Sequence, residues 1–310
     1  MEIMEAKEKM KFGKHAVEIS NRDKVFFPNS KYTKGDLIDY YEKISDIMIP
    51  HMKDRLISML RFPNGINDKQ FYQKDAPDYF PDWIEVKQVK KQEGGTTNYV
   101  ICNNTATLVY LANQACITPH IWLSKKDKLD YPDRMIFDLD PSDDDFSKVK
   151  SVAEKLKKFL EKDLDLPVYL MTTGSRGLHV VVPLERSSNF DEVRDFAQTI
   201  AKHLEAENPE EITTATQIKK RGNKLYMDTA RNGFGQTSVT PYAVRPIEGA
   251  PVATPIEWEE LENPSLTPQT YNIKNIFLRL GKKPDPWREI DRHSVSITSA
   301  RKKLDEIIKQ

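Results

Sequence analysis

Three observations in the central part of this 310-residue chain predict an α+β fold. Two segments, 146–162 and 190–204, carry apolar residues at the three- and four-residue spacing of an amphipathic helix. Short segments rich in apolar and β-branched residues predict four strands around them, at 133–140, 168–173, 178–184 and 224–228. The resulting order, β-α-β-β-α-β, is that of the split βαβ module of RRM-like domains.

An α/β region precedes this module. The segment 32–52 predicts a helix, because Thr33 and Asp36 occupy the positions of a capping box ahead of an apolar run. Pro50 is expected to end that helix, since proline lacks the N–H that an α-helix needs. The segment 55–65 then predicts a strand followed by an Asn-Gly turn.

Composition limits the functions open to the chain. Lysine and arginine number 47, as do aspartate and glutamate, so no general basic field is expected and indiscriminate polyanion binding is disfavoured. Two cysteines are too few for a disulfide framework or a four-cysteine zinc site. No apolar run is long enough to span a bilayer, and no signal-peptide core opens the sequence. We therefore expect a cytoplasmic protein without a membrane partner.

Two aspartates directly follow an apolar run in the stretch MIFDLDP. Because side chains alternate along a strand, Asp138 and Asp140 share one face, with Cβ atoms roughly 6–7 Å apart. The first and last strands of such a module are neighbours, so Asp228 is expected beside them. Three carboxylates on adjoining strands suit two divalent metal ions, as in polymerases, nucleases and phosphatases. A strand that runs into a solvated acidic turn is the simpler alternative.

A glycine-rich turn joins two strands of the same module, in the stretch TTGSRGLHV. Its small residues would let backbone N–H groups approach phosphate oxygens. Arg176 can bind phosphate through two parallel hydrogen bonds, and His179 is close enough in sequence to reach the same anion. Arg245 is a candidate second phosphate ligand. Taken alone, the stretch fits an ordinary hairpin slightly better, with His179 a satisfied strand residue. Beside a metal platform, however, such a pocket would suit a nucleoside triphosphate.

Together these motifs closely resemble a known family. The stretches FDLDP, GSRGLHVVVP, LYMD with RNGFGQTSVTPYAVRP, and GAPVATPIEW are similar to the polymerase domain of bacterial and archaeal ligase D, in the archaeo-eukaryotic primase superfamily. The resemblance extends through NRDKVFFPNSKYTKGDLIDYY, RFPNGINDKQFYQKDAP and ANQACITPHIWLS, and covers about residues 15–285. It implies an archaeo-eukaryotic primase fold, in which the RRM-like module packs against an N-terminal α/β module.

The resemblance also implies how the chain is organised. A flexible N-terminus at 1–14 precedes a primase-polymerase domain at 15–290, and a C-terminal helix follows at 291–310. The expected parts of that domain are an N-terminal α/β module with DNA-end binding at 15–125, an RRM-like catalytic module at 126–260 and a C-terminal extension at 261–290.

Catalytic and nucleotide-binding residues follow from the resemblance by matching position. It implies that Asp138, Asp140 and Asp228 hold two catalytic divalent ions, Mn²⁺ or Mg²⁺. The residues implied to bind the incoming NTP or dNTP are Thr173, Gly174, Ser175, Arg176, His179, Arg245 and His120. For His120, a histidine packed in the core is the alternative.

The resemblance further implies two DNA contacts. Asn21, Lys24 and Lys34 match residues that bind a downstream 5′-phosphate, while Phe71, Tyr72 and Arg221 match residues that contact the template. Lys34 also falls in the first turn of the expected helix, where free N–H groups and the helix dipole attract phosphate. A buried pair of strand residues is the alternative for the two aromatic residues.

The implied activity is that of a metal-dependent nucleotidyltransferase. The family fills gaps and extends ends on a template, with preferred ribonucleotides, during non-homologous end joining. Expected partners are DNA gaps or broken ends carrying a 5′-phosphate, together with separate ligase, nuclease and Ku proteins at the nucleoid. Two alternatives stay open on the residues: an Asp-x-Asp phosphohydrolase with one aspartate as nucleophile, or a non-catalytic RRM-like module that binds nucleic acid through sheet-face aromatics.

Overall fold

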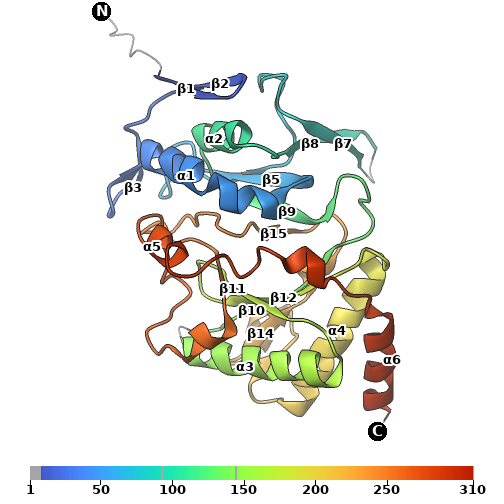
Figure 1. The fold of residues 1–310 in the computed structure, drawn as a ribbon. Coiled ribbons are helices and arrows are strands. Elements are labelled where there is room, and N and C mark those ends of the chain that lie inside the picture. Colours follow the sequence, from blue (N-terminus) through green and yellow to red (C-terminus); the bar gives the residue numbers. More distant parts are fainter. Residues whose placement is uncertain (1–7, 92–93, 144, 310) are drawn as a thin grey trace, which may run out of the picture.

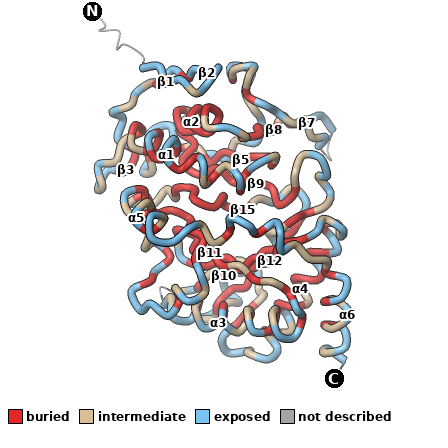
Figure 2. Tube along the Cα trace, viewed as in Figure 1, coloured by how far each residue is buried: buried red, intermediate tan, exposed pale blue. Residues whose placement is uncertain are grey.

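Two six-stranded sheets dominate the computed structural model, which describes residues 8–91, 94–143 and 145–309 (Figure 1). They lie one above the other, with α1 and α2 outside one sheet and α3 and α4 outside the other (Figure 1). Buried residues are concentrated in the strands and on the inward sides of these helices (Figure 2). Among the described residues, no helix is both long and apolar enough to cross a membrane.

The first sheet has the order β15-β9-β5-β8-β7, and β6 pairs with β5. Its strands are β5 (Arg55–Arg61), β6 (Phe71–Gln73), β7 (Val86–Lys90), β8 (Thr96–Ile101), β9 (Cys116–Lys125) and β15 (Thr237–Val239). Its helices are α1 (Lys34–Met52) and α2 (Thr105–Asn113). Two hairpins precede or flank them, β1 (Glu8–Phe12) with β2 (His15–Ile19), and β3 (Val25–Phe27) with β4 (Tyr32–Thr33).

The second sheet has the order β13-β14-β10-β12-β11-β16. Its strands are β10 (Arg134–Asp140), β11 (Tyr169–Thr172), β12 (Leu178–Pro183), β13 (Ile212–Thr213), β14 (Leu225–Asp228) and β16 (Thr254–Ile256). Its helices are α3 (Phe146–Lys158), α4 (Phe190–Glu207) and α6 (Ile297–Ile308), whereas α5 (Ile276–Leu280) packs against α1, where Phe277 contacts Tyr40. This confirms the predicted β-α-β-β-α-β order and the pairing of its first strand with its last, β10 with β14.

Alternation along the second sheet divides its side chains between two different cores. Phe137 and Leu139 face α3 and α4 in one core, whereas Ile136 and Val181 pack in the core that includes the first sheet. Because successive side chains point to opposite faces, Asp138, which lies between Phe137 and Leu139, must point toward the first sheet. The acidic residues therefore lie on the face between the two modules.

Four local expectations are corrected. Helix α1 has the predicted Thr33 capping box but continues through Pro50 to Met52, whose complete burial holds the last turn in place. Within the N-terminal segment expected to be flexible, β1 pairs with β2, while residues 1–7 lie outside the described residues. The C-terminal helix begins only at Ile297, since Val295 first bridges to Leu184.

The fourth correction concerns the module boundary. Strand β15 lies within the expected catalytic module, 126–260, yet it pairs with β9 of the first sheet. The chain thus returns to the N-terminal module after β14, and it comes back to the second sheet with β16. Both sheets therefore contribute to any site built on residues 230–250.

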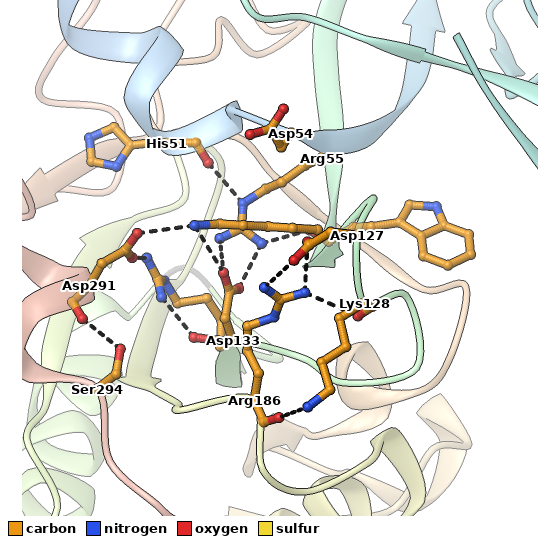
Figure 3. Close-up of polar contacts among 12 residues, drawn as sticks. His51, Asp54, Arg55, Asp127, Lys128, Asp133, Arg186, Asp291 and Ser294 are labelled. Carbon is orange, nitrogen blue, oxygen red and sulfur yellow. Dashed lines mark hydrogen bonds and ion pairs between the residues drawn. The ribbon is translucent and has the colours of Figure 1, made fainter.

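A buried ion pair joins the two modules where β9 leads into β10 (Figure 3). Arg55 on β5 lies 2.7 Å from Asp133, and its guanidinium also donates to the carbonyl oxygens of His51 and Trp122. Burial would raise the pKa of Asp133, but Arg55 and Arg134 outweigh it and lower that pKa. Because both members of the pair are buried, losing either one leaves an uncompensated charge.

We expect Arg55→Met to destabilise the protein by about 3–5 kcal/mol, because Asp133 would remain buried and charged without its partner. Urea unfolding measures this loss. The matched control is Arg301→Met, which removes the partner of the exposed Asp195 and should cost at most about 1 kcal/mol. Adding Asp133→Leu to Arg55→Met should recover part of the loss. Equal unfolding midpoints for Arg55→Met and the control would contradict this role.

Candidate active site

The strand register brings the three predicted carboxylates together. Asp138 on β10 lies directly opposite Asp228 on β14 and directly opposite His179 on β12. Residues directly opposite in an antiparallel pair have Cβ atoms roughly 4.5–5.5 Å apart. Asp140, two residues further along β10, lies opposite Tyr226 and shares the same face.

Basic side chains surround Asp138. His179 Nε2 lies 3.4 Å from one of its carboxylate oxygens, and Arg231 Nε lies 3.4 Å from the other. Burial alone would raise the pKa of Asp138, but His179 and Arg231 outweigh it and lower that pKa to about 2. Asp138 is therefore ionised at neutral pH, as a metal ligand must be.

Asp140 and Asp228 have different surroundings. Arg176 donates a hydrogen bond of 3.2 Å to the Asp140 carboxylate, and Arg221 lies 3.8 Å from the same carboxylate. Burial nevertheless raises the pKa of Asp140. Asp228 accepts hydrogen bonds from the Ala230 N–H at 2.7 Å and, at 3.3 Å, from the hydroxyl of Tyr226. The side chain of Asp228 is thus fixed by its own strand and the turn that follows.

The carboxylates suit hard divalent cations in donor type and in sharing one face. In the part of the chain that the structure describes, however, no three carboxylate, histidine or cysteine side chains already converge as a metal cage. Arginine and histidine side chains now contact Asp138 and Asp140 instead. Holding a cation would therefore require Arg176 and Arg231 to exchange a carboxylate for another anion, and phosphate is the anion best matched to arginine.

The glycine-rich turn is closed by Thr173 rather than left open as an anion nest. The Thr173 hydroxyl accepts from the N–H groups of Ser175 and Gly177, both at 3.2 Å, and donates to the Gly177 carbonyl. Those two N–H groups are therefore bonded within the turn. Thr173 and Gly174 shape the turn, while the side chain of Arg176 extends toward Asp140.

Two glycines permit this turn to approach its neighbours. Gly174 has φ +65°, and a Cβ atom there would lie 2.8 Å from the side chain of Arg245. A Cβ atom at Gly177 would lie only 1.9 Å from the carbonyl oxygen of Leu139 on β10. The lack of a side chain at Gly177 therefore lets the turn rest against β10 beside Asp140, while Gly174 lets it approach Arg245.

A pocket of about 200 Å³ opens between the two sheets. The second sheet and its loops supply Asp138, Asp140, Thr173, Ser175, Arg176, Gly177, His179, Arg231 and Arg245. The first sheet supplies Tyr72, His120, Thr237 and Val239. Most predicted nucleotide-binding residues therefore meet at one place, and Gly174 lies in the turn just behind them.

Arg231 is the functional candidate that sequence reasoning missed. It lies three residues after Asp228, in the short 3₁₀ turn Ala230–Asn232, and it combines a contact with Asp138 and a place in the pocket wall. Its only signal in the sequence is that proximity to Asp228. Thr237 and Val239 were also missed, because the return of β15 to the first sheet carries no local signal.

His120 is buried and also faces the pocket, so both interpretations of this residue hold in part. Its Nε2 atom has no hydrogen-bond partner among the described residues. Burial, followed by the charges of Arg245 and Arg231, lowers the pKa of His120 to about 3, so its imidazole is neutral. The edge of the Tyr72 ring meets His120 with centroids 5.5 Å apart.

The predicted template residues are exposed. Phe71 is 44% and Tyr72 58% exposed on β6, which rules out the alternative of a buried strand pair. Arg221 instead folds back toward the acidic site, where its guanidinium stacks 3.7 Å above the ring of Tyr226 and lies 3.8 Å from Asp140. Tyr72 therefore connects the exposed aromatic surface with the pocket, whose wall it also forms.

The three predicted phosphate-binding residues meet at the start of α1. The N–H of Lys24 donates to the carbonyl of Asn21, and that of Lys34 donates to the carbonyl of Lys24. Lys34 is buried, and its ammonium donates to Ser20 at 2.6 Å. Burial, followed by the charges of Lys24 and Arg61, lowers the pKa of Lys34 to about 8.

Three N–H groups at this helix start already have acceptors. Those of Lys34 and Gly35 donate to the carbonyls of Lys24 and Arg22, each at a distance of 2.8 Å, and that of Asp36 donates to the N-cap hydroxyl. Direct binding of phosphate by these groups would require them to leave these acceptors. An anion here would be held by lysine side chains instead.

We expect Gly177→Ala to destabilise the protein by about 1–3 kcal/mol or more, because the new methyl group would overlap the Leu139 carbonyl in the second sheet. Thermal unfolding measures the change. Gly281→Ala is the matched control, since its Cβ would lie 3.3 Å from the nearest atom, the carbonyl oxygen of Phe277. If both variants unfold at the same temperature, the close approach of the turn to β10 is not required.

Comparison with known proteins places this geometry in a family. The sequence model of the LigD, primase-polymerase domain matches residues 33–287. The bifunctional non-homologous end joining protein LigD of Bacillus subtilis is 32% identical over 279 residues, covering 89% of this chain and 44% of that protein. The multifunctional non-homologous end joining protein LigD of Mycolicibacterium smegmatis is 31% identical over 253 residues. That match covers 81% of this chain and 33% of that protein. The chain thus spans less than half the length of these relatives.

A solved structure agrees with this match. The polymerase domain from Mycobacterium tuberculosis ligase D, in complex with DNA, is similar with a TM-score of 0.83 and 27% identity, covering 90% of this chain and 99% of that chain. The predicted α+β primase fold is thereby confirmed. From the family match, the relatives and the shared fold together, it follows that this chain belongs to the LigD primase-polymerase domain family.

Proposed function

We propose that this chain transfers nucleotides to the 3′ end of a DNA strand under the direction of a template. A primase-polymerase domain is a nucleotidyltransferase, and family membership supports that class of reaction. The single observation that carries the proposal is the position of Asp138, which faces Asp228 on one side and His179, with the basic pocket, on the other. Carboxylates and cations meet there as nucleotide chemistry requires.

The incoming nucleotide would lie in the pocket between the sheets. Arg176, His179 and Arg245 would bind its triphosphate, with Arg176 moving from Asp140 to a phosphate oxygen. Thr173, Gly174 and Ser175 would keep the turn closed beside it, and neutral His120 would offer its unpartnered Nε2 to a polar group. Two divalent ions, Mn²⁺ or Mg²⁺, held by Asp138, Asp140 and Asp228 would activate the attacking hydroxyl and stabilise charge on the leaving pyrophosphate.

DNA would reach the pocket across the first sheet. The exposed rings of Phe71 and Tyr72 suit stacking on template bases, which favours no particular sequence, and Arg221 would contact the same strand beside Asp140. Asn21, Lys24 and Lys34 would bind a downstream 5′-phosphate. Filling of gaps during non-homologous end joining, preferred use of ribonucleotides, and cooperation with ligase, nuclease and Ku proteins belong to the same proposal.

The two alternatives fit the structure less well. A non-catalytic RRM-like module would present aromatic side chains on its sheet, yet this sheet face presents carboxylates, and the exposed rings of Phe71 and Tyr72 lie on the other sheet. An aspartyl-phosphate phosphohydrolase needs one free nucleophilic carboxylate, whereas Asp138 and Asp140 each contact two basic side chains. Family membership favours the polymerase.

We expect Asp140→Ala to lower primer extension at least 100-fold while DNA binding stays within about threefold, because the carboxylate acts in the reaction and repels the DNA backbone. Extension of a 5′-phosphorylated gapped duplex, with NTPs or dNTPs and with Mn²⁺ or Mg²⁺, measures the activity. Asp143→Ala is the control, since Asp143 pairs with Lys148 in the acidic turn beyond the strand. Extension by Asp140→Ala at the control rate would overturn the proposal.

We expect the preference for 5′-phosphorylated over 5′-hydroxyl DNA to decline as pH rises above about 8, because Lys34 then loses its proton. Below that pH Lys34 is charged, and the phosphate is largely dianionic throughout, since its second pKa is about 6. Bound phosphate raises the pKa of Lys34, so the decline should centre somewhat above 8.

Affinities of the two DNA forms, measured by fluorescence anisotropy between pH 7 and 9.5, give this ratio. Lys34→Arg keeps its charge over the whole range and should show a constant ratio. A wild-type ratio that also stays constant would show that Lys34 is not the phosphate ligand.

A further inference from the structure

A second hollow, of about 260 Å³, adjoins the acidic site at the outer edge of the catalytic sheet. Helix α4, the segment after β13 and the end of β14 form its walls, and Asp228 lies between it and the nucleotide pocket. Strand β13 pairs with β14 only as far as Thr213, opposite Tyr226. Within the described residues, the edge of β14 beside Met227 and Asp228 therefore has no further strand partner.

The side chains in this hollow suit a phosphodiester backbone. Arg194 and Lys202 are exposed on α4, and neither forms an ion pair within the described part of the chain. Thr214, Thr216 and Thr229 add hydroxyl groups to the walls. The carboxylate of the nearby Glu205 is already engaged, since it accepts hydrogen bonds from the Thr214 hydroxyl at 2.6 Å and the Thr214 N–H at 3.1 Å.

The spacing of the two cations matches a nucleic-acid strand. Eight residues separate Arg194 from Lys202, which corresponds to roughly 12 Å along a helix at 1.5 Å per residue. Phosphates of one DNA strand follow each other at roughly 3.4 Å along the duplex axis. The two cations can therefore contact different phosphates of a single strand.

The in-line geometry of phosphoryl transfer indicates which strand this is. The attacking and leaving oxygens lie on opposite sides of the phosphorus. The proposed triphosphate ligands Arg176 and His179 lie on the β12 side of Asp138, whereas Asp228 and the hollow lie on the β14 side. With the triphosphate on the β12 side, in-line attack would bring the 3′-hydroxyl from the β14 side, where the strand that carries it could pass over the hollow.

We propose that this hollow binds the backbone of the primer strand, with Arg194 and Lys202 contacting phosphodiesters close to its 3′ end. The inference rests on the proposed polymerase function and adds a site for the strand being extended. Both cations act by binding and positioning this strand. Their contribution therefore falls on primer affinity and leaves nucleotide affinity unchanged.

The test compares Arg194→Gln/Lys202→Gln with Lys158→Gln/Lys302→Gln. The control also removes two exposed cations, from α3 and α6 on the same outer layer. Affinity for a primer–template with a dideoxy 3′ terminus is measured without extension. We expect the first variant to bind roughly tenfold or more weakly than wild type, since hydrogen bonds to charged groups are of that size. The slope of log affinity against log salt should fall by roughly 2. Nucleotide affinity and the control should match wild type.

A second arm identifies the ligand. Methylphosphonate links near the primer 3′ end remove the phosphate charge, so they should weaken wild type and the control but leave the Arg194→Gln/Lys202→Gln variant unaffected. Equal weakening of all three proteins, or primer affinity of the variant equal to that of the control, would overturn the proposal. If wild type neither extends primers nor binds nucleotide, the proposed function fails. If all proteins extend and bind primer alike, only this inference fails.

Discussion

The antiparallel register around β10 is the constraint on which the functional site depends. It places Asp138 opposite Asp228 on one neighbouring strand and opposite His179 on the other. A shift of one residue would turn Asp138 into the helix-covered core and bring Phe137 or Leu139 to the site. The burial of those two residues against α3 and α4 therefore fixes the positions of the carboxylates. Core packing and site geometry are thus set by the same strand.

The packing of the two sheets adds the second half of the site. His120 and Tyr72 come from the first sheet, while Arg176 and Arg245 come from the second sheet and its loops. The buried pair of Arg55 and Asp133 joins the modules just before β10 begins. Burying two charges costs much of what their attraction returns, so the pair adds little net stability, although loss of either partner would leave a buried charge.

Charge balance explains how so many ionisable groups share one small region. Asp138 keeps a low pKa because His179 and Arg231 outweigh the effect of burial. His120 has its pKa lowered by burial and by the same cationic surroundings. The site thus combines the ionised carboxylate of Asp138, charged arginines and the neutral imidazole of His120 at neutral pH. A triphosphate with its metal ions could replace these internal pairs without leaving a buried charge uncompensated.

The sequence alone determined the element order of the catalytic module, the shared face of Asp138 and Asp140, and the Thr33 capping box, because strand alternation and helix caps are local properties. Only the tertiary structure decided the rest. The return of β15 to the first sheet, the contact between Arg231 and Asp138, and the occupied N–H groups at the start of α1 join residues far apart in the chain or depend on backbone turns. Pro50 continues a helix because burial of Met52 outweighs one lost hydrogen bond. Such outcomes depend on packing between distant parts of the chain, so no short stretch of sequence predicts them.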